Sequence, residues 1–143
     1  MDALDLTKAP PRPPRTKLAG LDLLMAARSV DKFRATLPGG KLGDYAITGF
    51  TMRMLETLGL GEEEFRDAVA RAANDIEIAD WLREVCSPSQ FAEVNRIIAA
   101  RLVRDRIGDA DFRKRYPHAV SLPLDMPIVD MLPIDDELVF AKG

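Results

Sequence analysis

The stretch from Leu18 to Leu37 constrains the fold more than any other, because its apolar residues would cover almost the whole circumference of a helix. At about 100° per residue, its apolar side chains point in nearly all directions: Leu18, Leu21, Leu23, Leu24, Met25, Ala26, Ala27, Val30, Phe33 and Leu37. Pro38 and two glycines then stop the pattern. We therefore expect a helix from about Thr16 to Leu37 that is packed by neighbours on several sides.

Capping and breaking signals divide most of the remaining chain into further helices. The expected helices are a short one closed by Gly59, one that opens at Gly61 with Glu62, Glu63 and Glu64, one capped by Asn74, one capped by Ser87 that runs to about Ile107, and a short one opened by Asp109 and stopped before Pro117. The fold class predicted is mostly α: a single compact domain of five or six helices over residues 17–116, with an extended proline-rich arm at each end.

We expect different structures for the two terminal arms. Residues 1–16 are rich in proline, which favours extended structure. Because Leu4 and Leu6 offer apolar anchors, we favour a strap across the domain or a partner subunit over a flexible binding arm. Residues 117–143 are expected to be irregular and to pack on the domain or a partner subunit, with one helical turn near residues 128–132 and a short edge strand at "LVF" as an alternative.

Composition excludes several classes of function. The 143 residues hold 20 basic and 23 acidic side chains, a net charge of -3, so no basic field attracts nucleic acid or a membrane surface. No apolar run approaches the roughly 20 residues that span a bilayer, and we expect a cytoplasmic protein. With Cys86 and His118 each the single residue of its type, a zinc site is not expected, and Cys86 is interpreted as a buried inert thiol. Neither a metal nor a nucleotide cofactor is predicted.

Charges inside the apolar stretch are the candidates for function. Asp31 and Arg34 point between apolar directions of the expected helix and must be paired or face a cavity, because a lone buried charge is too costly. Asp31 is three residues from both Arg28 and Arg34, a spacing that allows a shared ion pair. The pair is either a closed structural anchor, which we slightly favour, or the polar wall of a pocket. Lys32 points well away from both and carries less weight.

The loop "GGKLGDY" follows this helix. Its glycines allow a tight backbone path, and Asp44 and Tyr45 are candidates for the polar lining of a small pocket. The glycines come after a helix, whereas nucleotide-binding loops follow a strand and open a helix. A nucleotide site is therefore not favoured.

With these residues in view, the chain resembles a bacterial family catalogued as domain of unknown function 5069. The resemblance rests on the proline-arginine lead of "PPRPPRTKLAGLDLLMAARSVDKFRA", on "GDY", "LETLGL" and "WL", and more faintly on "SPSQFAEVN" and "PIDDE". It implies a small cytoplasmic single-domain protein and carries no residue roles. The chain departs from the family pattern at Val94 and at Phe33, whose bulk would reshape a neighbouring pocket.

The leading hypothesis is a small-molecule-binding domain. Its more specific form is a lyase or isomerase that works by acid-base chemistry without a cofactor on a small anionic or carbonyl- or phenol-bearing substrate. The candidate catalytic residues are Tyr45, Asp44, His118 and Asp31, and the candidate substrate-binding residues are Arg34, Lys32 and Phe33.

The alternative is a non-catalytic homo-oligomeric module, most simply a dimer, or a protein-interaction module with arms swapped between subunits. Asp135 and Asp136 lie in an acidic terminal run and are expected to be solvated. The basic residues of the last two expected helices form a surface on which the acidic tail of the same or a partner chain could dock.

Overall fold

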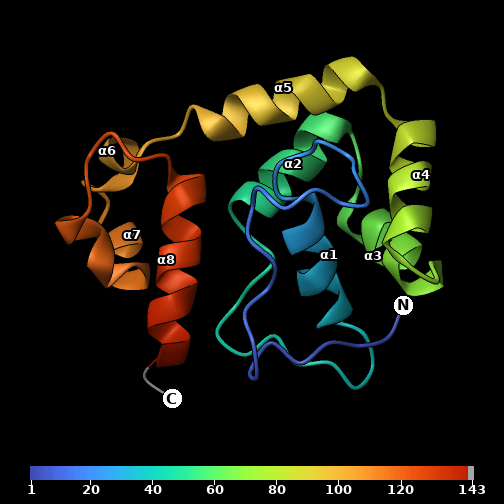
Figure 1. Ribbon diagram of the computed structural model, residues 1–143, viewed down its shortest axis with the longest axis horizontal. Coiled ribbons are helices and arrows are strands. Elements are labelled where there is room, and N and C mark those ends of the chain that lie inside the picture. The colour runs from blue at the N-terminus through green and yellow to red at the C-terminus, as the bar shows by residue number, and fades with distance from the viewer. Residues whose placement is uncertain (142–143) are drawn as a thin grey trace.

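The computed structural model describes residues 1–141 of the chain. Its helices, labelled in Figure 1, are α1 (Ala26–Arg34), α2 (Phe50–Leu58), α3 (Glu62–Arg71), α4 (Asp75–Val85), α5 (Pro88–Ala99), α6 (Val103–Arg106), α7 (Ala110–Arg115), the 3-10 helix η1 (Pro117–Ser121) and α8 (Ile128–Ala141). The predicted mostly helical class is confirmed. The α-helices within the described range are more numerous than the predicted five or six, because α6 and α8 are additional elements.

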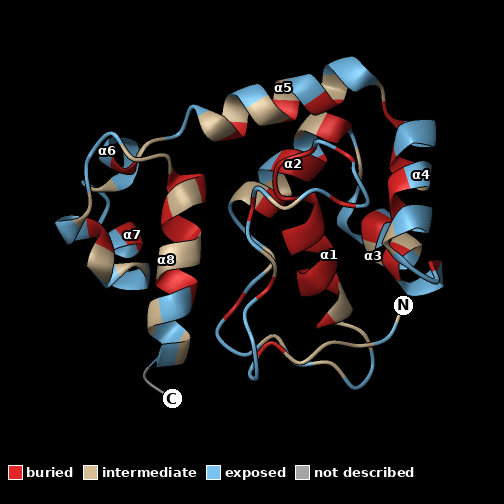
Figure 2. Cartoon of the chain, viewed as in Figure 1, coloured by how far each residue is buried: buried red, intermediate tan, exposed pale blue. Residues whose placement is uncertain are grey.

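The helix α1 is the central element, and it is buried along most of its length (Figure 2). It is shorter than predicted, since it begins at Ala26 and not near Thr16. The chain before it adopts left-handed backbone conformations at Ala19 (φ 48°) and Met25 (φ 73°). Such φ values do not occur inside a right-handed α-helix. Its apolar residues are nevertheless buried, with Leu18 fully enclosed. The apolar run therefore predicted burial correctly throughout, but predicted the helix correctly only over α1 and wrongly over residues 16–25, because periodicity alone cannot separate a buried helix from other buried chain.

Local capping chemistry sets the next boundaries as predicted. The amide of Glu77 donates to the side chain of Asn74 at the start of α4 (3.1 Å), and Ser87 and Gln90 form a capping box at the start of α5. Gly59 takes the left-handed position after α2 (φ 71°), a conformation that favours glycine.

The prediction that the fifth helix reaches Ile107 is wrong, because α5 ends at Ala99. Beyond it, the Val103 amide donates to Met126 (2.8 Å) and the Ile128 amide donates to Arg101 (2.9 Å). The backbone from 101 to 104 therefore pairs with the chain that leads into α8 instead of continuing the helix.

The C-terminal segment is the largest correction to the predicted architecture. Residues 128–141 form the helix α8 and not an irregular arm, and "LVF" lies in this helix and not in a strand. Pro133 lies inside α8, where a proline removes one helical hydrogen bond and ordinarily destabilises the helix. Burial on two sides of the helix, with Val129 and Met131 in different apolar clusters, compensates, since tertiary packing supplies most helix stability in proteins. The predictions for Lys142 and Gly143 lie outside the described residues.

Of the three apolar clusters among the described residues, two are large, and the third is the small group of Leu6, Ala35 and Tyr45. The larger lies among α1 to α5, and the smaller lies among α6, α7, η1 and α8, with Phe50 of α2 packed against both. The helix α5 runs along one edge and joins the two groups (Figure 1). No helix within residues 1–141 is long and apolar enough to cross a membrane.

The N-terminal segment lies as a strap on its own domain, in agreement with the strap interpretation. The Leu6 amide donates to the Lys41 carbonyl (2.8 Å), and the Lys41 amide donates to the Leu4 carbonyl (3.1 Å). Leu6 is 2% exposed. The two leucines thus serve as the apolar anchors that their place in the sequence suggested.

Candidate functional site

A group of ionisable side chains is buried where α1 meets α8 and the loop that contains Tyr45. We call it the Arg28 cluster and define it as Arg28, Lys32, Tyr45, Asp135 and Asp136, each no more than 8% exposed. The Arg28 guanidinium donates twice to the Asp136 carboxylate, at 2.7 and 3.1 Å, and the Tyr45 hydroxyl donates to the same carboxylate at 2.8 Å. Arg28 also lies over the Tyr45 ring, 5.7 Å from its centroid. The three groups therefore form one buried hydrogen-bonded unit.

Burial and neighbouring charges shift the protonation of the cluster. Burial raises the pKa of the Tyr45 phenol, and the hydrogen bond to Asp136 adds to the effect, so Tyr45 stays neutral. Burial also raises the pKa of Asp135. Burial, together with the positive charges of Arg28 and Arg115, lowers the pKa of Lys32 to about 8. Perturbed titrating groups gathered in one place are a feature of functional sites.

The acidic pair of α8 is not solvated as predicted, since Asp135 and Asp136 are 8% and 4% exposed. The carboxylate of Asp136 pairs with Arg28, and that of Asp130 pairs with Arg15 at 2.6 Å. These ion pairs join α8 to α1 and to the N-terminal segment, and apolar residues of α8 pack with Val103 and Phe112 of the later helices. Because Asp136 lies far along the chain from its partner Arg28, no local sequence pattern indicates that it is buried and paired.

Asp31 belongs to a second network and is not paired with Arg28 or Arg34 as predicted. Its carboxylate accepts hydrogen bonds from the backbone amide of Arg12 (2.8 Å) and from the Arg12 guanidinium (3.0 Å). The same guanidinium donates to Asp75 of α4 at 2.7 Å, and these contacts raise its pKa. Arg12 therefore ties the N-terminal strap to α1 and α4 at once. Of the two alternatives for Asp31, the closed anchor is the one that its contacts describe.

The Arg12 clamp gives a testable expectation for stability. Replacement of Arg12 by Lys keeps the charge but cannot span two carboxylates with a planar fork, so we expect a loss of about 1–3 kcal/mol of unfolding free energy. The same substitution at Arg83, whose guanidinium contacts Asp80 on the exposed face of α4, is expected to change stability by less than about 0.5 kcal/mol. Urea unfolding of the two variants measures the difference, and equal stabilities would contradict the clamp.

The other predicted site residues are dispersed. Phe33 is fully buried in the core, with its ring 5.0 Å from that of Phe65. Arg34 donates to the carbonyl of Asp2 at 2.8 Å. Asp44 is exposed, and its carbonyl accepts from Arg115 at 2.9 Å.

His118 lies in η1 and is close enough to the Arg28 cluster for its charge to lower the pKa of Asp135. Of the predicted residues, the structure thus brings Lys32 and Tyr45 into one cluster with His118 beside it, and leaves Asp31, Phe33, Arg34 and the Asp44 side chain elsewhere.

A cleft of about 780 Å³ opens between the two apolar clusters. We call it the arginine cleft, after the four arginines among its lining residues: Arg53, Arg101, Arg106 and Arg115. Aromatic and aliphatic side chains from both clusters supply the rest of its surface, among them Phe50, Met52, Ile97, Phe112, Tyr116, Ile128 and Leu132, and its two acids are Glu56 and Asp111. The lining therefore combines an excess of positive charge with apolar and aromatic surface.

The arginines of the cleft are only partly committed to partners. Arg106 contacts Asp109 at 3.2 Å and lies over the Phe112 ring, and Arg53 is 3.9 Å from Glu56. Arg115 lies over the Tyr116 ring. Arg101 forms no side-chain hydrogen bond or ion pair with any other residue in the range 1–141. Donor groups are thus left for a bound anion.

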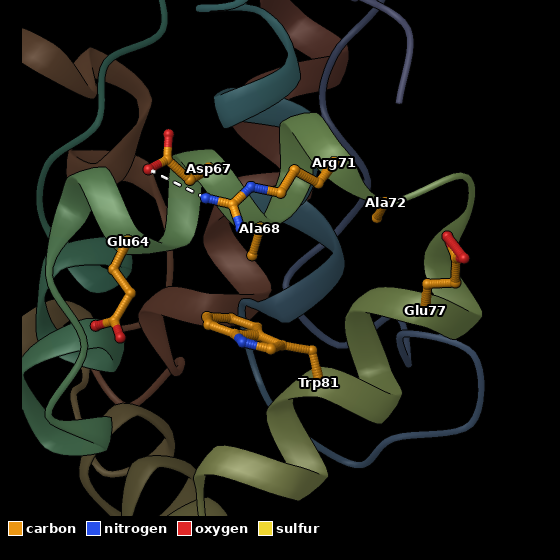
Figure 3. Close-up of a pocket in the computed structure, with 7 residues that line it drawn as sticks. All are labelled: Glu64, Asp67, Ala68, Arg71, Ala72, Glu77 and Trp81. Carbon is orange, nitrogen blue, oxygen red and sulfur yellow. Dashed lines mark ion pairs between the residues drawn. The ribbon is translucent and has the colours of Figure 1, made fainter.

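A second cleft, of about 440 Å³, lies between α3 and α4 and is lined by Trp81 and several acidic residues (Figure 3). Its acids already have partners within the protein. Glu64 accepts the Gly61 amide, Glu77 accepts the Ala73 amide, and Asp67 pairs with Arg71 at 4.0 Å. We conclude that these carboxylates serve the helix ends, and that the arginine cleft is the better candidate for a ligand.

The protein is thus a small all-α domain in which the Arg28 cluster lies against α8. The family model described as Domain of unknown function (DUF5069) matches residues 8–123, and the chain belongs to that family. This confirms the resemblance that the sequence motifs indicated. No curated protein matches the chain. The matched range includes Lys32, Tyr45 and the cleft arginines, whereas α8 lies beyond it.

Reasoning from the sequence missed the arginine cleft and both acids of the Arg28 cluster. One usable signal is present in the sequence, namely the bias toward arginine in the later helices, which we interpreted as a docking surface for the acidic tail and not as the lining of a cleft. The opposite wall of the arginine cleft, with Phe50 and Arg53, comes from α2, which is far from the later helices in the sequence. Only tertiary structure brings the two walls together.

Proposed function

We propose that this protein binds a small organic anion, one that carries a carboxylate or phosphate on an apolar or aromatic body, in the arginine cleft. The observation that supports this proposal most is the set of four guanidinium groups around apolar and aromatic surface. Guanidinium groups form charge-assisted and bidentate hydrogen bonds to carboxylates and phosphates, and aromatic rings stack on apolar ligand surface. The volume of about 780 Å³ suits a small molecule.

A fluorescence titration with 8-anilinonaphthalene-1-sulfonate, an aromatic anion, tests the binding proposal. We expect saturable binding with one site per chain and competition by benzoate. Replacement of Arg101 by Ala removes one uncommitted charge from the cleft and is expected to weaken binding about 10-fold, or about 1.4 kcal/mol. Replacement of Arg83 by Ala, at an exposed position of α4, is the matched control. Equal affinities of the two variants would contradict the proposal.

A second part of the proposal is that the protein is a lyase or isomerase that works by acid-base chemistry. Neither cleft described above is lined by Tyr45, Asp44, His118 or Asp31, so the acid-base roles predicted for them remain predictions. The same holds for the predicted dimer and for the cytoplasmic location. Light scattering on the purified chain measures the oligomeric state: we expect a dimer, and a monomer at all concentrations would contradict that expectation.

A further inference from the structure

We infer that the ligand of the arginine cleft is a linear dicarboxylate, an apolar chain with one carboxylate at each end, which is held by Arg101 at one end of the cleft and by Arg115 at the other. The inference rests on the proposed function, because it names the ligand class of the same cleft. It adds the number of anionic groups and the distance between them, and each of these has its own test.

The first argument is the charge of the cleft lining. Four arginines and two acids line the cleft, so the lining carries an excess of two positive charges. Two of the four, Arg53 and Arg106, lie 3.9 and 3.2 Å from an acidic side chain. Arg101 and Arg115 form no ion pair with any carboxylate of residues 1–141. A ligand with two anionic groups therefore matches the cleft better than a ligand with one.

The second argument is that Arg101 and Arg115 lie at opposite ends of the cleft, and the contacts along α8 locate each of them. The Ile128 amide donates to the Arg101 carbonyl at 2.9 Å, and Ile128 itself lines the cleft. Because Ile128 is the first residue of α8, Arg101 lies at the level where this helix begins.

Arg115 lies further along the same helix. Its guanidinium donates to the Asp44 carbonyl at 2.9 Å, and the hydroxyl of the adjacent Tyr45 donates to Asp136 at 2.8 Å. These contacts place Arg115 near the level of Asp136, about two helical turns beyond the start of α8, or about 11 Å along the helix axis. Burial raises the pKa of Asp135 and the charge of Arg115 opposes that rise, which agrees with this position.

The third argument is the surface between the two arginines. Leu132 lines the cleft one helical turn after Ile128, and so lies between the two levels. Phe112 of α7 and Phe50 of α2 add aromatic surface to the lining. A methylene chain that covers such surface gains free energy from the burial of apolar area. A compact dianion such as inorganic phosphate leaves this surface uncovered.

The class of ligand follows from these three observations together. Guanidinium groups bind carboxylates through paired, charge-assisted hydrogen bonds. Arg115 keeps donors for such a pair, because its contact with the Asp44 carbonyl uses only one of its nitrogens. A chain of the length of suberate, when extended, brings one carboxylate to each arginine. Succinate is too short to reach both arginines, and octanoate carries only one carboxylate.

Isothermal titration calorimetry of the intact chain with suberate, octanoate and succinate tests the inference. At pH 7.5 all their carboxyl groups are ionised, and the ionic strength is held constant. Suberate and octanoate have chains of the same length and differ by one charge, whereas suberate and succinate have the same charge and differ in length. We expect suberate to bind at least about 10-fold more tightly than either, because only suberate engages both arginines at once.

The outcomes separate this inference from the proposed function. Octanoate that binds as tightly as suberate would overturn the second carboxylate, and succinate that binds as tightly would overturn the spacing. Both results leave the binding of organic anions in the cleft standing. If none of the three ligands binds, the inference fails, and the proposed function fails with it when the anilinonaphthalene sulfonate does not bind either.

A substitution at Arg115 tests the second end of the cleft by itself. Arg115→Gln removes the charge and keeps a donor for the Asp44 carbonyl. We expect the suberate affinity to fall about 10-fold, and the octanoate affinity to change by less than about 2-fold because its carboxylate binds Arg101. Arg104→Gln is the matched control, since Arg104 is exposed and does not line the cleft. An Arg115→Gln variant that keeps the full preference for suberate would overturn the role of Arg115.

Discussion

Replacement of Asp136 by Asn is expected to lower the free energy of unfolding by about 3–5 kcal/mol, because it leaves the buried Arg28 guanidinium without its counter-ion. The Asp136 carboxylate is 5% exposed and accepts three hydrogen bonds, two from Arg28 and one from Tyr45. Asn keeps the shape and one acceptor but removes the charge. Urea unfolding followed by circular dichroism measures the loss.

The same helix offers a matched control. Asp130 also pairs with an arginine, Arg15, but both side chains of that pair are exposed, at 41% and 53%. Solvent-exposed pairs contribute about 0–1 kcal/mol, so replacement of Asp130 by Asn is expected to change stability by no more than that. If the two variants lost the same stability, the Arg28–Asp136 pair would not be the contact that holds α8 against α1.

A double substitution separates the pair from its surroundings. Arg28 and Asp136 replaced together by Met and Leu leave no uncompensated charge, although the Tyr45 hydroxyl loses its acceptor. Because buried ion pairs can be exchanged for apolar groups at little loss, the double variant is expected to be more stable than either single variant. A double variant as unstable as the sum of the singles would show that the two residues act independently.

Replacement of Lys32 by Met is expected to stabilise the protein at pH 7 by about 3 kcal/mol. The folded-state pKa of Lys32 is lowered from 10.5 to about 8, and a pKa difference of one between the folded and unfolded states corresponds to about 1.4 kcal/mol. Below pH 8 the lysine is charged in both states, and the folded state carries the full penalty. The substitution of exposed Lys41 by Met is the control, with an effect within about 0.5 kcal/mol.

The sign of the pH dependence follows from the same lowered pKa. Between about pH 8 and pH 10.5 the unfolded state binds more protons at Lys32 than the folded state does, so the stability of the wild-type chain rises with pH over this interval. Tyr45 acts in the opposite sense above about pH 10, because its raised folded-state pKa holds a proton that the unfolded chain releases. The wild-type slope between pH 7.5 and 9.5 also contains Cys86, whose raised pKa acts in the opposite sense, so the difference in slope between the wild-type chain and a Lys32→Met variant isolates Lys32. A wild-type chain and a Lys32→Met variant with the same slope in this range would contradict the assignment.

The sequence predicted those parts of the fold that depend on near neighbours in the chain. Asn74, Ser87 and Asp109 each cap a helix through an amide two or three residues ahead, so a short stretch of sequence contains the whole interaction. Gly59 likewise takes its left-handed conformation within the turn that it closes.

The candidate site depends on residues that the sequence keeps far apart. Arg28 and Asp136 are 108 positions apart, and Tyr45 and Asp136 are 91 apart. The prediction of an Asp31 pair with Arg28 or Arg34 used only helical spacing, and Arg12 from the strap replaced both. Helical geometry correctly directed Lys32 away from Asp31. That direction points to Asp136 and Arg115, which only the folded chain places there.

The α8 helix illustrates a conflict between local and tertiary interactions. Pro133 disfavours a helix locally, and the prediction of an irregular arm rested on the three prolines of residues 118–143 and on the lack of a long apolar period there. In the folded chain, burial of Val129, Met131 and Leu132 and the ion pairs of Asp130 and Asp136 outweigh the lost hydrogen bond. Local propensity therefore predicted the wrong secondary structure at a segment that long-range contacts hold in place.

Binding of a small organic anion in the arginine cleft is most directly tested by nuclear magnetic resonance of the labelled protein during a benzoate titration. We expect the guanidinium Nε–Hε signals of Arg53, Arg101 and Arg115 to shift together and to saturate, and the indole signal of Trp81, in the other cleft, to stay in place. Benzyl alcohol, which lacks the charge, should leave all of them unchanged. Shifts that concentrate at Trp81, or that do not saturate at the arginines, would contradict the proposed binding site.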